Sequence, residues 1–215
     1  MPDRSMSPAR KTQLLWPAGL AALAALAVSA TGQPAGTTRA FENDQYRYSV
    51  ALPAGCRHEE GPGTLDAVCS PELDPDKSVE ASATSALVLE VTAEAVPDDA
   101  GKPASALAQQ FGEGDFRGEL PEMICGETDG SRVRIDNLVK VVEETRVVYT
   151  ANVTCPGIKF LALGERRATA RYFITPGLRY RLMARALTDD YEQRKDEINA
   201  FFSSFKVLAQ EKRSQ

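Results

Sequence analysis

Histidine is nearly absent from this sequence, and with it most of the chemistry that needs an imidazole. His58 is the only histidine in 215 residues, and its place beside Cys56 is typical of a solvated bystander rather than a general base. No G-x-S-x-G elbow marks a serine hydrolase, and no C-x-x-C pair marks a zinc site. Ser203 and Lys206 have the spacing of a serine–lysine nucleophile but no partner motif. We therefore expect no catalytic residue, no metal and no cofactor.

Basic residues are also in deficit, with 25 Lys and Arg against 30 Asp and Glu and a net charge of −5. A nucleic-acid surface needs clustered Lys and Arg to neutralise phosphates. We therefore expect no nucleic-acid partner.

Long apolar runs are missing except near the start of the chain. Arg4, Arg10 and Lys11 precede the apolar run at residues 19–28, and the small residues 28–30 follow it, which is the pattern of a signal peptide cleaved after Ala30. The run from Leu14 to Ala30 contains Pro17 and is shorter than the roughly 20 residues that span a bilayer, although an uncleaved anchor is the alternative. The sequence predicts a signal peptide at 1–30, export to the periplasm or the extracellular space, and no stable membrane span after cleavage.

All four cysteines lie in the part that would be exported: Cys56, Cys69, Cys125 and Cys155. An even number of cysteines in an oxidising compartment indicates two disulfides, for which three pairings are possible. We predict the pairs Cys56–Cys69 and Cys125–Cys155, because each closes a local loop that is bounded by turn residues.

Hydrophobic periodicity predicts one α+β domain at residues 41–208, after a flexible leader at 31–40 and before a disordered tail at 209–215. Alternation predicts six strands at 45–52, 86–96, 133–143, 146–155, 168–175 and 178–187. In the third of these we expect Val133, Ile135, Val139 and Val141 to be buried. Helices are predicted from Pro103 to Gly112 and over 189–204, with a short last strand at 205–208. We expect loops at 56–75 and 112–130, while 158–163 is either an extension of a strand or a buried loop.

Six arginines lie between residues 165 and 185, against the general acidity of the chain. A three-residue loop at 175–177 would pair Ile174 with Leu178 and place all the apolar residues of this hairpin on one face. A two-residue loop would instead mix apolar residues and arginines, and we expect the first register because burying unpaired arginine is costly. The three-residue loop predicts a recognition surface on the outer face of the hairpin, formed by Arg171, Arg179, Arg181, Arg185 and Phe173. The alternative is an ion-paired face covered by the acidic helix at 189–204.

Three short motifs resemble the PsbP-like α/β/α sandwich superfamily over about residues 41–208. They are Tyr46-x-Tyr48-x-Val50-x-Leu52-Pro53, Gly177-Leu178-Arg179-Tyr180-x-Leu182 and Phe201-x-x-Ser204-Phe205. The resemblance implies an antiparallel sheet flanked by helices in a small, non-enzymatic protein that binds other proteins. It carries over no functional residue, and the four cysteines and the Gly-rich stretch 112–130 depart from the family pattern.

Together these features predict an exported, monomeric, non-enzymatic binding or adaptor domain that recognises a protein or an anionic envelope component. Two alternatives remain, a periplasmic hydrolase that uses carboxylates and a carrier of a small apolar ligand. Paired buried carboxylates in a cleft would favour the hydrolase, and a large apolar pocket would favour the carrier.

Overall fold

A computed structural model describes residues 38–70, 86–126, 132–157 and 164–209, apart from the side chain of residue 115. The predicted signal peptide, most of the predicted leader, the segment 158–163 and the tail from residue 210 lie outside the described residues.

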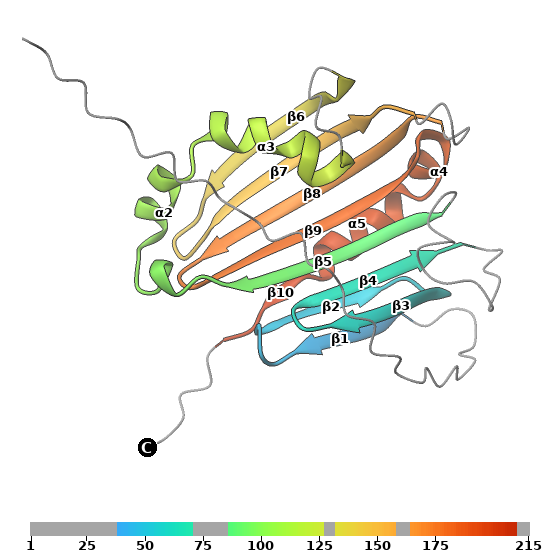
Figure 1. Ribbon diagram of the computed structural model, residues 1–215. Helices are drawn as coiled ribbons and strands as arrows, with labels where there is room; N and C mark the ends of the chain where they lie inside the picture. The colour runs from blue at the N-terminus through green and yellow to red at the C-terminus, as the bar shows by residue number, and fades with distance from the viewer. Residues whose placement is uncertain (1–37, 71–85, 127–131, 158–163, 210–215) are drawn as a thin grey trace, which may run out of the picture. The chain divides into compact units, whose positions relative to one another are not determined.

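Two antiparallel sheets form the framework (Figure 1). The larger has seven strands in the order β3-β4-β5-β9-β8-β7-β6. Its strands are β3 (Cys56–Gly61), β4 (Thr64–Cys69), β5 (Leu87–Ala95), β6 (Arg134–Val142), β7 (Val147–Cys155), β8 (Arg166–Thr175) and β9 (Leu178–Leu187). The smaller sheet has the order β1-β2-β10 and consists of β1 (Arg39–Asn43), β2 (Tyr48–Leu52) and β10 (Lys206–Val207).

Helices cover both faces of the larger sheet. A short 3-10 helix, η1 (Pro97–Asp99), follows β5, and then α2 (Ala104–Gln110) and α3 (Glu113–Cys125) pack on one face, which we call the α3 face. The helices α4 (Thr188–Gln193) and α5 (Lys195–Ser204) lie on the opposite, α5 face together with the smaller sheet. This is the predicted α+β architecture with helices on both sides of an antiparallel sheet.

The core on the α5 face is built around aromatic rings. Tyr48 of β2, Tyr180 of β9 and Phe205 meet with ring centroids 5.5 to 6.2 Å apart. The helix α5 adds buried side chains at i, i+3 and i+4, as its sequence predicts: Ile198, Phe201 and Phe202. Burial of each large side chain contributes roughly 1.5–3 kcal/mol.

The core on the α3 face lies over β6 to β9 and contains fewer buried aromatic side chains. Phe116 of α3 is the main aromatic contact from the helices, with its ring centroid 4.5 Å from those of Tyr149 and Tyr172. Beneath the helices the strands contribute a mixture of side chains, from Ala151 and Ala170 to Leu138, Ile174 and Met183.

Both predicted disulfides are confirmed. Cys56 and Cys69 are directly opposite each other in the β3–β4 hairpin, with Cα atoms 4.1 Å apart. Cys125, the last residue of α3, is bonded to Cys155 at the end of β7, with a Cα separation of 5.5 Å.

Two of the predicted loops are regular elements. The stretch 56–75 contains the β3–β4 hairpin, and the stretch 112–130 contains α3. The outer strand β3 is charged on both sides, so it shows no alternation, and α3 contains Gly114, Gly118 and Pro121, which are poor helix formers. Tertiary contacts and the disulfides override these weak local signals. The predicted leader is also shorter, because β1 begins at Arg39.

The expected burial of β6 is wrong by one position. A bulge between Ile135 and Asn137 shifts the register against β7, so Leu138 is buried while Val139 and Val141 are exposed. A single inserted residue moves every later side chain to the other face of a strand. No feature of the sequence marks this bulge.

The predicted register of the β8–β9 hairpin is also wrong. Thr175 pairs with Leu178 across a two-residue turn, and Ile174 therefore pairs with Arg179. Gly177, at φ +80°, supplies the left-handed conformation of this turn. This register is favourable because Phe173 and Tyr180 then share the aromatic core of the α5 face. Arg179 and Arg181 lie on the other face of β9, where they form ion pairs with acids outside the hairpin.

Candidate functional site

The structure divides the predicted recognition residues between the two faces. Phe173 lies buried on the α5 face and stacks on Phe205, with ring centroids 4.9 Å apart. Arg171, on the same face, lies over the ring of Phe202 at 5.0 Å, and burial lowers the pKa of its guanidinium. Arg179, Arg181 and Arg185 lie at alternate positions on the other face of β9. The five residues therefore do not form one surface.

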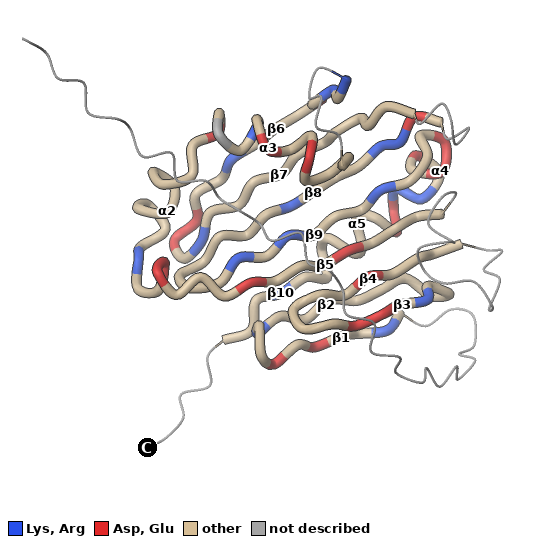
Figure 2. The backbone as a smooth tube through the Cα atoms, in the orientation of Figure 1, with Lys and Arg blue, Asp and Glu red and all other residues tan. Residues whose placement is uncertain are grey.

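The arginines of β9 lie beside a row of acids on β5 and η1 (Figure 2). Arg179 donates to the buried carboxylate of Asp99 at 2.7 Å, and Lys102 donates to the same side chain at 2.8 Å. Burial alone would raise the pKa of Asp99, but these two hydrogen bonds outweigh it and lower the pKa. Arg181 is paired with Glu90 in the same way. This row is compensated internally and offers no excess of positive charge.

A pair of carboxylates, Asp66 and Glu90, is the arrangement closest to acid–base chemistry. The two residues are directly opposite on β4 and β5. Burial, and then the charges of Glu90 and Glu59, raise the pKa of Asp66 from 3.8 to about 6. A carboxyl group in such a state can act as a general acid. Neither carboxylate, however, lines a described pocket.

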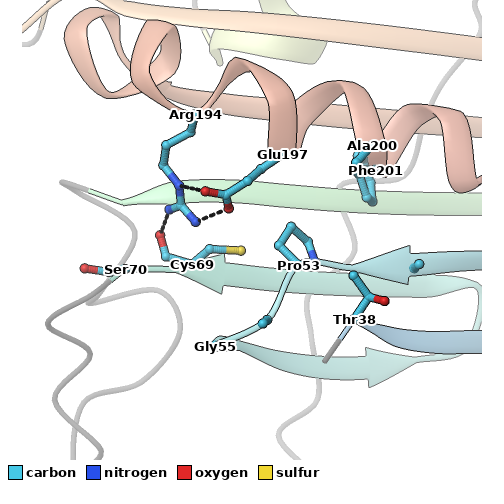
Figure 3. Close-up of a pocket in the computed structure, with 11 residues that line it drawn as sticks. Thr38, Pro53, Gly55, Cys69, Ser70, Arg194, Glu197, Ala200 and Phe201 are labelled. Carbon is cyan, nitrogen blue, oxygen red and sulfur yellow. Dashed lines mark hydrogen bonds and ion pairs between the residues drawn. The ribbon is translucent and has the colours of Figure 1, made fainter. Parts of the chain in front are cut away.

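A hollow lies on the α5 face, between α5 and the ends of β2, β3 and β4 (Figure 3). Its volume is about 640 Å³, within the range of small-molecule sites. Its walls consist mainly of small or apolar side chains: Thr38, Ala51, Pro53, Ala54, Gly55, Cys69, Ser70, Arg194, Glu197, Ala200 and Phe201.

Local structure explains why the walls leave space. Pro53 and Gly55 turn the chain from β2 into β3, where the Cys56–Cys69 disulfide holds the strand ends together. On the opposite wall, Glu197, Ala200 and Phe201 follow each other at i, i+3 and i+4 along α5. Because Ala200 carries only a methyl group, the helix leaves room above the turn.

Arg194 sits at the break between α4 and α5 and reaches across the rim of the pocket (Figure 3). Sequence periodicity predicts one helix over 189–204, so this break was missed. The guanidinium donates to both carboxylate oxygens of Glu197, at 2.6 and 3.2 Å, and to the carbonyl oxygen of Cys69. Glu197 is 42% exposed. An arginine with a partly exposed anionic partner therefore borders an apolar hollow.

Sequence reasoning did not identify this pocket, because its residues come from four separate stretches of the chain. The motifs that contain Pro53 and Phe201 were interpreted as core and turn residues only. The signal that could have indicated a hollow was the turn at 53–55, where Pro53 and Gly55 lie between a strand and a disulfide-bonded cysteine.

The described residues show no other obvious chemistry. His58 packs edge-to-face on Phe41 at 4.6 Å, and burial followed by the charge of Arg39 lowers the pKa of its imidazole. Within the described ranges, no three His, Cys, Asp or Glu side chains are grouped to hold a metal ion. No described helix is long and apolar enough to cross a membrane.

Comparison with known proteins supports the fold. The chain is similar to the solution structure of cyanobacterial PsbP (CyanoP) from Synechocystis sp. PCC 6803, with a TM-score of 0.57, 17% identity, and coverage of 84% of this chain and 98% of that one. It is also similar to LpqN, a protein involved in cell envelope biogenesis of Mycobacterium tuberculosis, with a TM-score of 0.52, 11% identity, and coverage of 80% and 91%. No protein-family model and no curated protein matches the sequence. The fold is PsbP-like, as the sequence motifs predicted.

Proposed function

We propose that this chain is an exported binding domain, not an enzyme, that holds an anionic amphiphile of the cell envelope in the pocket between α5 and β2. The observation that carries the proposal is the pocket itself, in which small apolar walls end at the guanidinium of Arg194. An apolar group would fill the hollow, and an anionic group of the same molecule would replace Glu197 as the partner of Arg194.

Three further features support this assignment. The signal-peptide pattern and the two disulfides fit an oxidising, exported environment. The similar protein LpqN is described as acting in cell envelope biogenesis. The carboxylate pair of Asp66 and Glu90, which would favour a hydrolase, belongs to the α3 face and not to the pocket.

Binding of a dansyl-labelled fatty acid tests the proposal, using the oxidised chain that begins at Thr31. We expect saturable binding that Ala200→Trp weakens more than about tenfold, because the indole occupies the hollow. Arg194→Gln is expected to weaken binding about tenfold by removing the cation. Asn199→Trp is the matched control, since it adds the same indole to an exposed position of α5 that does not line the pocket.

The proposal is overturned if the wild-type chain does not bind the probe, or if Ala200→Trp and Asn199→Trp bind it equally well. Loss of binding in Ala200→Trp counts only if its thermal unfolding matches that of the control variant.

A further inference from the structure

The strand β6 forms one edge of the seven-stranded sheet, and its outer side has no partner strand among the described residues. The bulge at Asp136 turns Val139 and Val141 away from the α3 face. Val139, Val141 and Val142 are 43%, 48% and 51% exposed, and they are the exposed large hydrophobic residues of the described chain. An edge strand with an apolar centre is a template for pairing with another strand.

The usual protection of an edge strand is missing from the centre of β6. A lysine on an edge strand commonly prevents pairing with another chain, because its charge would have to be buried. Lys140 instead points to the α3 face, where its ammonium donates to the carbonyl oxygens of Ala108 and, at 3.1 Å, of Phe111. The opposite edge strand, β3, contrasts with this. It is closed by a disulfide and carries four consecutive polar residues, 57–60. The two edges of the sheet are therefore built differently.

Charge changes sign along β6. The residues around its start, Arg132, Arg134 and Asp136, sum to +1, and those just after its end, Glu143, Glu144 and Arg146, sum to −1. In an antiparallel arrangement of two identical strands, each start lies beside the other end. A pairing centred on Val139 brings Arg134 of each copy to the acidic pair Glu143 and Glu144 of the other, so the same strand complements itself in charge.

We propose that two copies of this chain pair antiparallel through β6, with a two-fold axis at Val139, and extend the sheet across both molecules. The valines at positions 139 and 141 of each copy then form a single apolar cluster on the α5 face, beside the half-buried Val148. An isologous contact of this kind closes on itself and forms a dimer rather than a fibre. The sequence analysis expected a monomer, and it also expected the valines at 139 and 141 to be buried.

Light scattering of the oxidised chain over a concentration range up to roughly 1 mM is the first test. We expect the mass to rise from that of one chain toward that of two. Val141→Lys should hold the mass at one chain, because it places two like charges in the apolar cluster. Glu60→Lys, on the β3 edge, should dimerise as the wild-type chain does. The half-exposed position of Val141 should leave folding intact, which the thermal unfolding of both variants verifies.

Crosslinking tests the geometry independently of the variant masses. Since the described chain has no free cysteine, Val139→Cys should form an intermolecular disulfide on mild oxidation, and Glu60→Cys should not. A single-chain mass at every concentration overturns the proposal. So does a dimer that Val141→Lys leaves intact, or one that Val139→Cys fails to crosslink.

Discussion

The two faces of the seven-stranded sheet are stabilised by different means. On the α5 face, Tyr48, Tyr180 and Phe205 pack within one continuous apolar core. On the α3 face, a second apolar core covers β6 to β9, and the part next to β5 is held by ion pairs such as that of Arg179 with Asp99. Burial of apolar surface is spread over many atoms, whereas a buried ion pair depends on two groups. We therefore expect single polar changes and pH to act mainly through the α3 face.

The largest expected difference between the faces concerns the disulfides. Replacing Cys125 and Cys155 by serine should lower the free energy of unfolding by about 4 kcal/mol, against about 3 for Cys56 and Cys69, because the closed loop is longer. Denaturant unfolding measures both. Since α3 contains two glycines and a proline, it should lose hydrogen-exchange protection first in the Cys125 and Cys155 variant. Retained protection of α3 would contradict the view that this disulfide holds the helix in place.

The second prediction concerns the ion pair at the turn of β8 and β9. Asp99→Asn should cost roughly 3 kcal/mol, because it leaves the largely buried guanidinium of Arg179 without its closest charge. The lowered pKa of Asp99 means that its contribution is present above the ordinary carboxyl pKa and is lost as the pH falls through the lower, folded value.

Glu94→Gln is the control for Asp99→Asn, since Glu94 lies 3.6 Å from the same arginine and is more exposed. We expect its effect on unfolding to be below about 1 kcal/mol. An equal loss of unfolding free energy in the two variants would contradict this prediction. It would show that Arg179 needs negative charge nearby but does not depend on the buried carboxylate of Asp99 in particular.

The smallest expected effect is a gain in stability. The folded chain keeps Asp66 protonated up to about pH 6, whereas the unfolded chain ionises it near pH 3.8. Folding stability should therefore fall as the pH rises from 4 to 6. Asp66→Asn should remove this dependence and stabilise the chain at pH 7.5 by roughly 1 kcal/mol, a discounted figure because part of the side chain faces solvent. Chemical denaturation at several pH values measures it. Since Glu59, Glu90, Arg181 and Arg185 also act on Asp66, an unchanged slope would assign the dependence to them.

The register of the β8–β9 hairpin shows where sequence reasoning succeeds and where it ends. The two strands, their turn and the aromatic stripe of α5 follow from local periodicity and were predicted correctly. The choice between registers depended on whether arginines could be buried. Their partners, Glu90 and Asp99, come from β5 and η1, eighty or more positions earlier. A hairpin considered alone cannot contain that information.

The same limit explains why the candidate site was missed. Local patterns predicted both disulfides and most strands, because these features involve neighbours in sequence. The pocket depends on the placement of Ala200 against the turn at Gly55, and the exposed edge depends on one bulge in β6. Both are set by packing between distant segments.

The pairing of β5 with β9 has a consequence for how the chain folds. The strands β3 to β5 form one meander of sequence neighbours and β6 to β9 form another, and only the ladder in which Val88 pairs with Arg185 joins them in one sheet. Each meander closes short loops, whereas joining them requires closure of the much longer loop between Ala95 and Leu178, with a correspondingly larger entropic barrier. The joining step should therefore come late and limit the folding rate, and until it occurs the apolar strand β5 presents an open edge on which newly made chains can aggregate.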